Sequence, residues 1–237
     1  YVSILVTNFF GFSVVIIGLY FYLIPGFCLL LITPQSLEKA QPEKSNSQIS
    51  KQQTPIGPWQ ILLVGILGIV ALVIETTLFS MWLADKKFAL GKNYDGIARY
   101  GDAEPYLVSA VNQNPNEPTF HDELSFNHSI VASYVWQNAS GSAQKVALSK
   151  PYIESAIKNS DEAVKTSPNN LLFWKTRTKV FYQLSLIDSK YLLEALNSII
   201  RASQLAPTDP KVSYNLGILY GKTGQTENAI QAFKQTI

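Results

Sequence analysis

One spacing of small and large residues occurs twice in this chain, and no other feature constrains the possible folds as strongly. Each copy has a leucine followed by a glycine, a tyrosine three residues after the glycine, and an alanine twelve residues after the glycine. The copies are Leu90, Gly91, Tyr94 and Ala103, and Leu216, Gly217, Tyr220 and Ala229. Small residues let two helices approach closely, and large residues fill the space beside the contact. The spacing therefore predicts a helical hairpin at each end of the region beyond residue 83.

The same positions are typical of a known helical repeat. The pattern resembles the tetratricopeptide repeat (TPR), a helix–turn–helix unit of about 34 residues, with Ala84 and Pro210 at the first positions of two repeats. Because a single repeat cannot bury its own apolar face, neighbouring repeats are expected to stack into a solenoid. The predicted repeats are about 84–117, 118–170, 171–209 and 210–237, the last of them truncated.

The two middle repeats are longer than the pattern. Pro115, Pro168 and Pro207 follow one another at intervals of 53 and 39 residues, where about 34 would be regular. Proline ends a helix because it cannot donate an intrahelical hydrogen bond. We expect an insertion around 138–151 to separate the two helices of the second repeat, and extra residues in the segment LSLIDSK to lengthen the turn of the third.

Two long apolar runs precede the repeats. Residues 1–32 contain no charged side chain, and residues 58–83 contain one. Since about 20 apolar residues cross the hydrocarbon core of a bilayer, both runs are predicted transmembrane helices. Residues 33–57 are rich in Gln, Ser, Pro and Lys and are predicted to form a flexible loop. The predicted fold class is all-α: two transmembrane helices followed by a TPR-type α-solenoid of about four helical hairpins.

The charged residue of the second run is Glu75. An ionised carboxylate near the middle of a bilayer costs about 2.5 kcal/mol or more unless it has a partner or water. Two interpretations remain open. Glu75 makes a packing or relay contact with another helix, or its carboxyl stays protonated or tilts toward the membrane surface.

Composition excludes several classes of function. The net charge is +2 and no basic stripe is present, so nucleic acid is not an expected partner. Cys28 is the only cysteine, which excludes a disulfide and a cysteine-based zinc site within the chain. His121 and His128 are the only histidines, and their spacing is too wide to hold one metal ion without other ligands. We expect no catalytic residue, metal or cofactor here.

The first helices of stacked TPR hairpins line a concave groove, which typically receives a peptide or a helix. The predicted groove residues are Phe88, Lys92, Lys175, Lys179, Tyr214, Ile218 and Lys222. Lysines mixed with aromatic rings suit an acidic or amphipathic segment of a protein partner. The alternative is that these side chains are simply solvated. Tyr214 stands where TPRs that clamp a peptide C-terminus have a lysine, so that role is not expected.

The distribution of positive charge predicts the orientation in the membrane. Lys86, Lys87, Lys92 and Arg99 follow the second apolar run, whereas Lys44 and Lys51 precede it. Since Lys and Arg accumulate on the cytoplasmic side of a span, the TPR region of this integral membrane chain is predicted to be cytoplasmic.

A wider resemblance rests on TNFFGFSVV in the first run and on WLADKKFALGKNYD, PNEP and DELSFN around the first repeats. The chain resembles the C-terminal region of bacterial O-antigen ligase or polymerase family proteins with a TPR tail. The resemblance implies a polytopic glycosyltransferase of a bacterial inner membrane, which transfers glycan from a polyprenyl-diphosphate carrier. The carrier with its glycan would be bound by a missing N-terminal part. No residue of this chain matches the family's catalytic Arg and His residues. Whether the chain is part of an enzyme therefore stays open. The alternative is a non-enzymatic membrane-anchored TPR adaptor for assembly or secretion of a complex.

Overall fold

A computed structural model of the chain describes residues 57–236. These residues form helices and turns, and no strand occurs among them. The helices are α3 (Pro58–Gly96), α4 (Tyr100–Gln113), α5 (Pro118–Asn138), α6 (Ser142–Thr166), α7 (Leu171–Leu184), α8 (Tyr191–Leu205), α9 (Pro210–Lys222) and α10 (Thr226–Lys234). The first predicted span, residues 1–32, and nearly all of the predicted loop lie outside the described residues.

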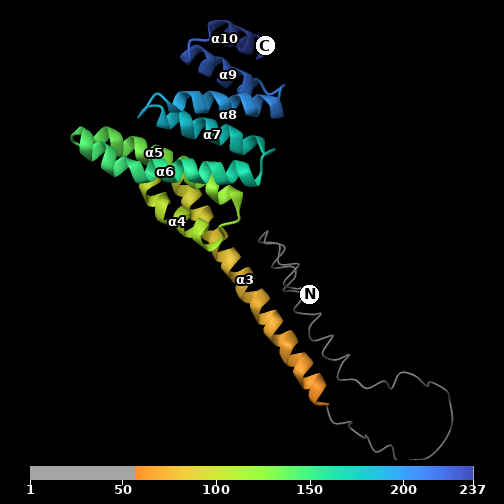
Figure 1. Cartoon of the computed structure of the whole chain (residues 1–237). Coiled ribbons are helices and arrows are strands. Elements are labelled where there is room, and N and C mark those ends of the chain that lie inside the picture. The colour runs from red at the N-terminus through yellow and green to blue at the C-terminus, as the bar shows by residue number, and fades with distance from the viewer. Residues whose placement is uncertain (1–56, 237) are drawn as a thin grey trace, which may run out of the picture. The chain divides into compact units, whose positions relative to one another are not determined.

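The helices beyond Thr76 form four hairpins that stack in chain order. The C-terminal part of α3 packs against α4 around Gly91 and Leu107. The pairs α5–α6, α7–α8 and α9–α10 follow (Figure 1). The hairpins contact one another through α4 and α5, α5 and α7, α6 and α7, and α8 and α9. The predicted all-α solenoid of four hairpins is therefore confirmed.

The glycines of the repeated spacing lie where the two helices of a hairpin are closest. A Cβ atom on Gly91 would lie 2.7 Å from the side chain of Leu107 on α4. A Cβ atom on Gly217 would lie 2.6 Å from the ring of Phe233 on α10. Since real Cβ atoms do not approach other carbons so closely, both sites need the glycine for the observed helix packing.

Three of the first helices begin with the same kind of hydrogen bond. The side chains of Glu117, Asn170 and Asp209 precede α5, α7 and α9 and accept from the backbone N–H two residues further on. Such a bond satisfies one of the N–H groups that a helix start leaves unpaired. The starts of these hairpins are therefore encoded locally, by the residue that precedes each helix.

The second hairpin differs from the prediction in how it accommodates its extra residues. The inserted residues do not separate the helices; they lengthen both, so that α5 has 21 residues and α6 has 25. The turn between them is short and contains Gly141 at φ 90°, a conformation that glycine adopts without strain. Pro151 lies inside α6 instead of bounding a loop.

The helix α3 contains the second predicted span. It has 39 residues, and its most apolar stretch has a mean hydropathy of 2.5 with none of its residues buried. By length and composition it is the one helix among residues 57–236 that could cross a membrane. Glu75 is exposed on it. The chain divides into two units between Thr76 and Thr77.

Candidate partner-binding surface

The predicted groove residues lie on corresponding turns of three first helices. Each helix contributes residues four positions apart, which share one helix face. The pairs are Phe88 and Lys92 on α3, Lys175 and Lys179 on α7, and Tyr214 and Ile218 on α9, with Lys222 one turn further along α9. Lys92, Lys179, Tyr214 and Lys222 are exposed, and the other three side chains are half-buried.

Two of the four lysines are paired with carboxylates of this chain. Lys92 Nζ lies 3.8 Å from Oε2 of Glu123 on α5. Lys175 Nζ lies 3.3 Å from Oδ2 of Asp209, the residue that caps α9. Both ion pairs join one first helix to the next. These lysines are therefore less available to an acidic partner than their sequence positions suggested.

The other two lysines lie over aromatic rings of the preceding first helix. Lys179 Nζ is 5.9 Å from the ring centroid of Phe126 on α5, and Lys222 Nζ is 5.4 Å from that of Tyr182 on α7. Cation–π contacts of this kind are worth about 0.5–1 kcal/mol at exposed sites. Neither lysine forms an ion pair within residues 57–236. Their ammonium groups remain accessible.

Phe88 and Tyr214 occupy corresponding positions but differ in exposure. The ring of Phe88 stacks on Phe120 of α5 with centroids 4.7 Å apart, so it belongs to the packing between the first two hairpins. Tyr214 is 54 % exposed and touches Phe233 at a centroid distance of 5.8 Å. Of the two, Tyr214 is the ring that another molecule can reach.

The prediction omitted α5, which contributes Asp122, Glu123 and Phe126 to the same surface. Asp122 stands four residues after Pro118, as Tyr214 stands four residues after Pro210, so the sequence did contain a signal for it. Burial raises the pKa of Asp122 to about 7. A hydrogen bond from Thr176 and the positive charges of Lys179 and Lys92 lower this pKa, but burial has the larger effect. Burial likewise raises the pKa of Glu123. The surface is therefore acidic on α5 and basic on α7 and α9.

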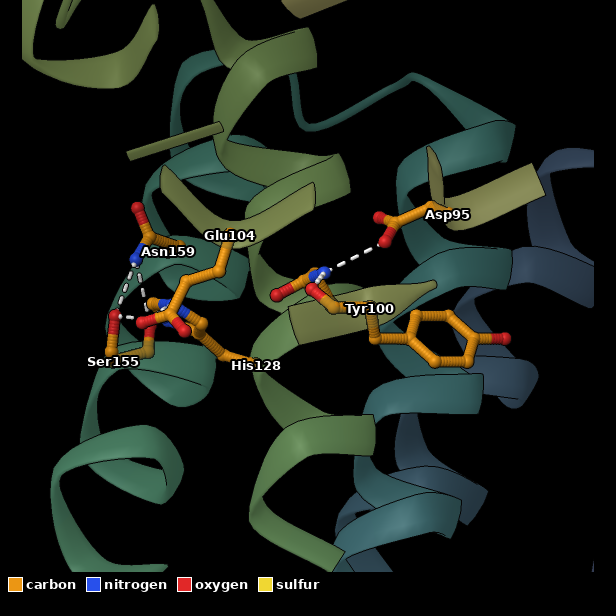
Figure 2. A network of polar contacts seen from close by, with 7 residues as sticks. Asp95, Tyr100, Glu104, His128, Ser155 and Asn159 are labelled. Atoms are coloured by element: carbon orange, nitrogen blue, oxygen red, sulfur yellow. Dashed lines mark hydrogen bonds and ion pairs between the residues drawn. The ribbon is translucent and has the colours of Figure 1, made fainter. Parts of the chain in front are cut away.

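A seam of buried polar side chains joins the first two hairpins (Figure 2). Asn127 is fully buried, and its Nδ2 donates to Oδ1 of Asp95 on α3 at 2.7 Å and to the carbonyl oxygen of Tyr100 at 2.9 Å. Burial raises the pKa of Asp95 to about 6, while the hydrogen bond from Asn127 opposes that rise. Asn127 thus hydrogen-bonds to one acceptor at the end of α3 and to another at the start of α4.

The second half of the seam is built around His128. Its Nδ1 lies 2.7 Å from Oγ of Ser155 on α6, and its Nε2 lies 3.7 Å from Oε1 of Glu104 on α4. Burial lowers the pKa of His128 to about 4, so the imidazole is neutral near pH 7. Figure 2 shows Asp95 and Tyr100 on one side of the seam and this cluster on the other.

The imidazole of His128 lies between Ser155 and Glu104, the arrangement of a nucleophile, a base and an acid. The surroundings of these three residues give no support for catalysis. Ser155 Oγ also accepts a hydrogen bond from Asn159 at 3.1 Å. The cavity of about 520 Å³ on the first hairpin is bordered by none of the three residues. Asn159 Oδ1 lies 2.6 Å from Nδ1 of His121, so both histidines contribute to helix packing. Among residues 57–236, no three His, Cys, Asp or Glu side chains are placed to hold a metal ion.

The comparisons with known proteins agree with the helix geometry. A family model described as tetratricopeptide repeat matches residues 210–237, the hairpin of α9 and α10. The chain contains a tetratricopeptide repeat, and its helical solenoid is TPR-like. No curated protein matches the chain.

Solved structures are similar at low identity, and one of them is described as a TPR protein. TTC0263, a thermophilic TPR protein in Thermus thermophilus, is 18 % identical, with 65 % of this chain and 72 % of that chain covered and a TM-score of 0.48. A crystal structure of MamA is 14 % identical, with 65 % and 75 % covered and a TM-score of 0.46. The structure titled MamA MSR-1 C2 is 18 % identical, with 65 % and 74 % covered and a TM-score of 0.43.

Proposed function

We propose that this chain is a membrane-anchored TPR scaffold that holds a partner protein against its first helices. The proposal is based on three accessible side chains of α7 and α9, the lysines Lys179 and Lys222 and the aromatic Tyr214. Exposed tyrosine rings are common anchors of protein interfaces, and exposed lysines can select a partner of opposite charge. The apolar stretch of α3 supports the membrane part of the proposal.

Photocrosslinking in cells tests the scaffold function. A photoreactive phenylalanine derivative at Tyr214 should form a discrete adduct with a partner protein, because this side chain is exposed on the proposed surface. The matched control is Leu193, which is similarly exposed (57 %) but lies on the second helix α8. We expect an adduct from position 214 and none from position 193. The same adducts from both positions, or none from either, would contradict the proposal.

A finer form of the proposal makes the chain the C-terminal region of an O-antigen ligase-like glycosyltransferase. Its support is the sequence resemblance of the apolar run and the first repeats. In that case the TPR recruits a partner to an enzyme whose glycan and polyprenyl carrier are bound elsewhere in a longer protein. A reading frame with eight or more further spans and an external loop containing Arg and His would support this form. A start codon just before Tyr1 would favour the adaptor.

The proposed orientation places the TPR domain in the cytoplasm, and cysteine labelling tests it. With Cys28 replaced by serine, single cysteines are introduced at Asn46 and at Ser142, which is exposed at the start of α6. On intact cells a membrane-impermeant maleimide should label position 46 and leave position 142 unlabelled until the cells are opened. The reverse pattern would place the partner of the TPR domain outside the cytoplasm.

A further inference from the structure

The charges on the first helices α5, α7 and α9 are segregated by sign, whereas α3 carries both. The helix α5 contains Asp122 and Glu123 and no Lys or Arg. The helices α7 and α9 contain five basic residues and no Asp or Glu, the five being Lys175, Arg177, Lys179, Lys211 and Lys222. Opposite charges on a partner would match this pattern, and like charges would be repelled. The surface therefore offers a partner two electrostatically different halves.

The half formed by α3 and α5 is largely neutralised within the chain. Glu123 is paired with Lys92, and its carboxylate is mostly covered. Asp122 is buried, holds a hydrogen bond with Thr176, and has a pKa raised to about 7. Its charge near neutral pH is therefore partial. This half has little unmatched charge to offer a ligand.

The half formed by α7 and α9 is different, because part of its positive charge is not matched. Lys175 and Arg177 have carboxylate partners, Asp209 and Asp161. Lys179 and Lys222 have aromatic rings beneath them and no ion pair within the described part of the chain, although Lys179 acts through its charge on Asp122 and Glu123. An ammonium group over a ring keeps most of its hydrogen-bonding capacity, since the ring contact uses none of its three donors.

Apolar contact area lies on the same helix as Lys222. Tyr214 is exposed on α9, and Ile218 is half-buried between Tyr214 and Lys222 at a spacing of four residues on each side. A segment that binds here can therefore bury an aromatic or aliphatic side chain next to its acidic groups.

We propose that α7 and α9 bind an acidic, partly apolar segment of a partner protein, with its carboxylates at Lys179 and Lys222 and an apolar side chain against Tyr214 and Ile218. This inference rests on the proposed scaffold function and names the chemistry of the partner. It restricts recognition to the α7 and α9 half of the predicted groove, because Lys92 on α3 is already paired. Within that half Lys175 is paired with Asp209, which leaves Lys179 and Lys222 for the partner.

Binding of synthetic peptides tests the proposal on the full chain in nanodiscs of zwitterionic lipid. The probe is a fluorescent twelve-residue peptide of Leu, Phe and four Glu, compared with versions in which every Glu is Gln or Lys. We expect fluorescence anisotropy to give at least tenfold tighter binding for the Glu peptide. Its affinity should fall as salt increases, since ions screen exposed charge pairs. Equal affinity of the Gln peptide would overturn the proposal.

Variants locate the site. Lys179→Glu and Lys222→Glu should each weaken the Glu peptide at least tenfold, and Lys222→Gln should weaken it severalfold. Lys92→Ala should change affinity less than twofold. Lys158→Glu, an exposed lysine on the second helix α6, is the matched control for charge and should also have little effect. Equal losses in Lys158→Glu and Lys222→Glu would mean that the peptide responds to overall charge, which contradicts the proposal.

The outcome separates this inference from the scaffold function. If Tyr214 crosslinks a partner in cells but the Glu peptide does not bind, the acidic chemistry is wrong and the scaffold function stands. If neither crosslinking nor peptide binding is observed, both are wrong.

Discussion

Replacing Asn127 with alanine should lower the free energy of unfolding of the TPR unit by about 3 kcal/mol at neutral pH. The side chain is fully buried and donates to Asp95 and to the carbonyl oxygen of Tyr100. Its removal deprives the buried Asp95 carboxylate of the hydrogen bond at Oδ1 and takes one of two donors from the Tyr100 carbonyl, which keeps its bond within α4. Leaving a buried acceptor unpaired costs about 1–3 kcal/mol, more for a charged group. Urea unfolding of the full chain in detergent micelles, followed by circular dichroism, measures the change.

The same variant should show a characteristic pH dependence. Burial raises the pKa of Asp95 from 3.8 to about 6. A raised pKa means that the buried carboxyl favours folding while protonated, and this contribution is lost as the pH rises through about 6. Without the opposing hydrogen bond from Asn127 the pKa rises further. The destabilisation should therefore be larger at pH 8 than at pH 5.

Two further variants check the cause. Asn138→Ala removes an exposed asparagine at the end of the same helix, and we expect a loss of less than about 0.5 kcal/mol. In an Asp95→Asn background the titrating group is absent, so the further loss caused by Asn127→Ala should be the same at pH 8 and at pH 5. An Asn127→Ala effect that is small, or identical at both pH values, would show that the seam does not depend on this contact.

The fold could be predicted from sequence wherever the repeat pattern is regular. Gly91 and Gly217 identified the first and last hairpins because each marks a close helix contact that few other residues allow. The second hairpin was harder, since residues inserted at a helix end can form a loop or continue the helix. The turn is at Gly141, and both α5 and α6 extend to meet it, so the inserted residues stay paired.

Burial depends on neighbours that the repeat pattern does not specify. Leu90 and Leu216 occupy the same repeat position, but Leu216 is 8 % exposed and Leu90 is 40 % exposed. Leu216 packs in a cluster that includes Leu196 and Ile199 of the preceding helix α8. Within residues 57–236 no TPR hairpin precedes α3 to cover Leu90 in the same way. The repeat position therefore predicts a leucine but not how much of its side chain is exposed.

The candidate surface was only partly predictable for the same reason. The spacing of four residues predicted which face of its helix Lys92, Lys175 or Lys179 occupies. Their partners come from the next or the preceding first helix, so the ion pairs depend on how far neighbouring hairpins are shifted along one another. That shift results from packing across the whole hairpin. A single sequence does not reveal it, and it decides which lysines stay available.

Replacing Gly91 with valine should destabilise the first hairpin by about 3 kcal/mol, because the helices α3 and α4 have no room for a side chain there. A Cβ atom would lie 2.7 Å from Cγ and Cδ2 of Leu107, a fully buried residue that packs against Leu124 of α5 and cannot swing outward. Since about 1 kcal/mol shifts the melting temperature of a domain this size by about 2–4 °C, we expect a decrease of about 6–12 °C.

The matched control is Gly101→Val on α4 in the same hairpin, where a Cβ atom meets nothing within 4 Å. We expect it to leave the melting temperature nearly unchanged, because valine has a higher helix propensity than glycine. The double variant Gly91→Val with Leu107→Ala should lose less stability than the sum of its single changes, since the smaller residue vacates the space that valine needs. Strict additivity would mean that the two side chains do not compete, and the close helix contact would then not be the reason for glycine at this position.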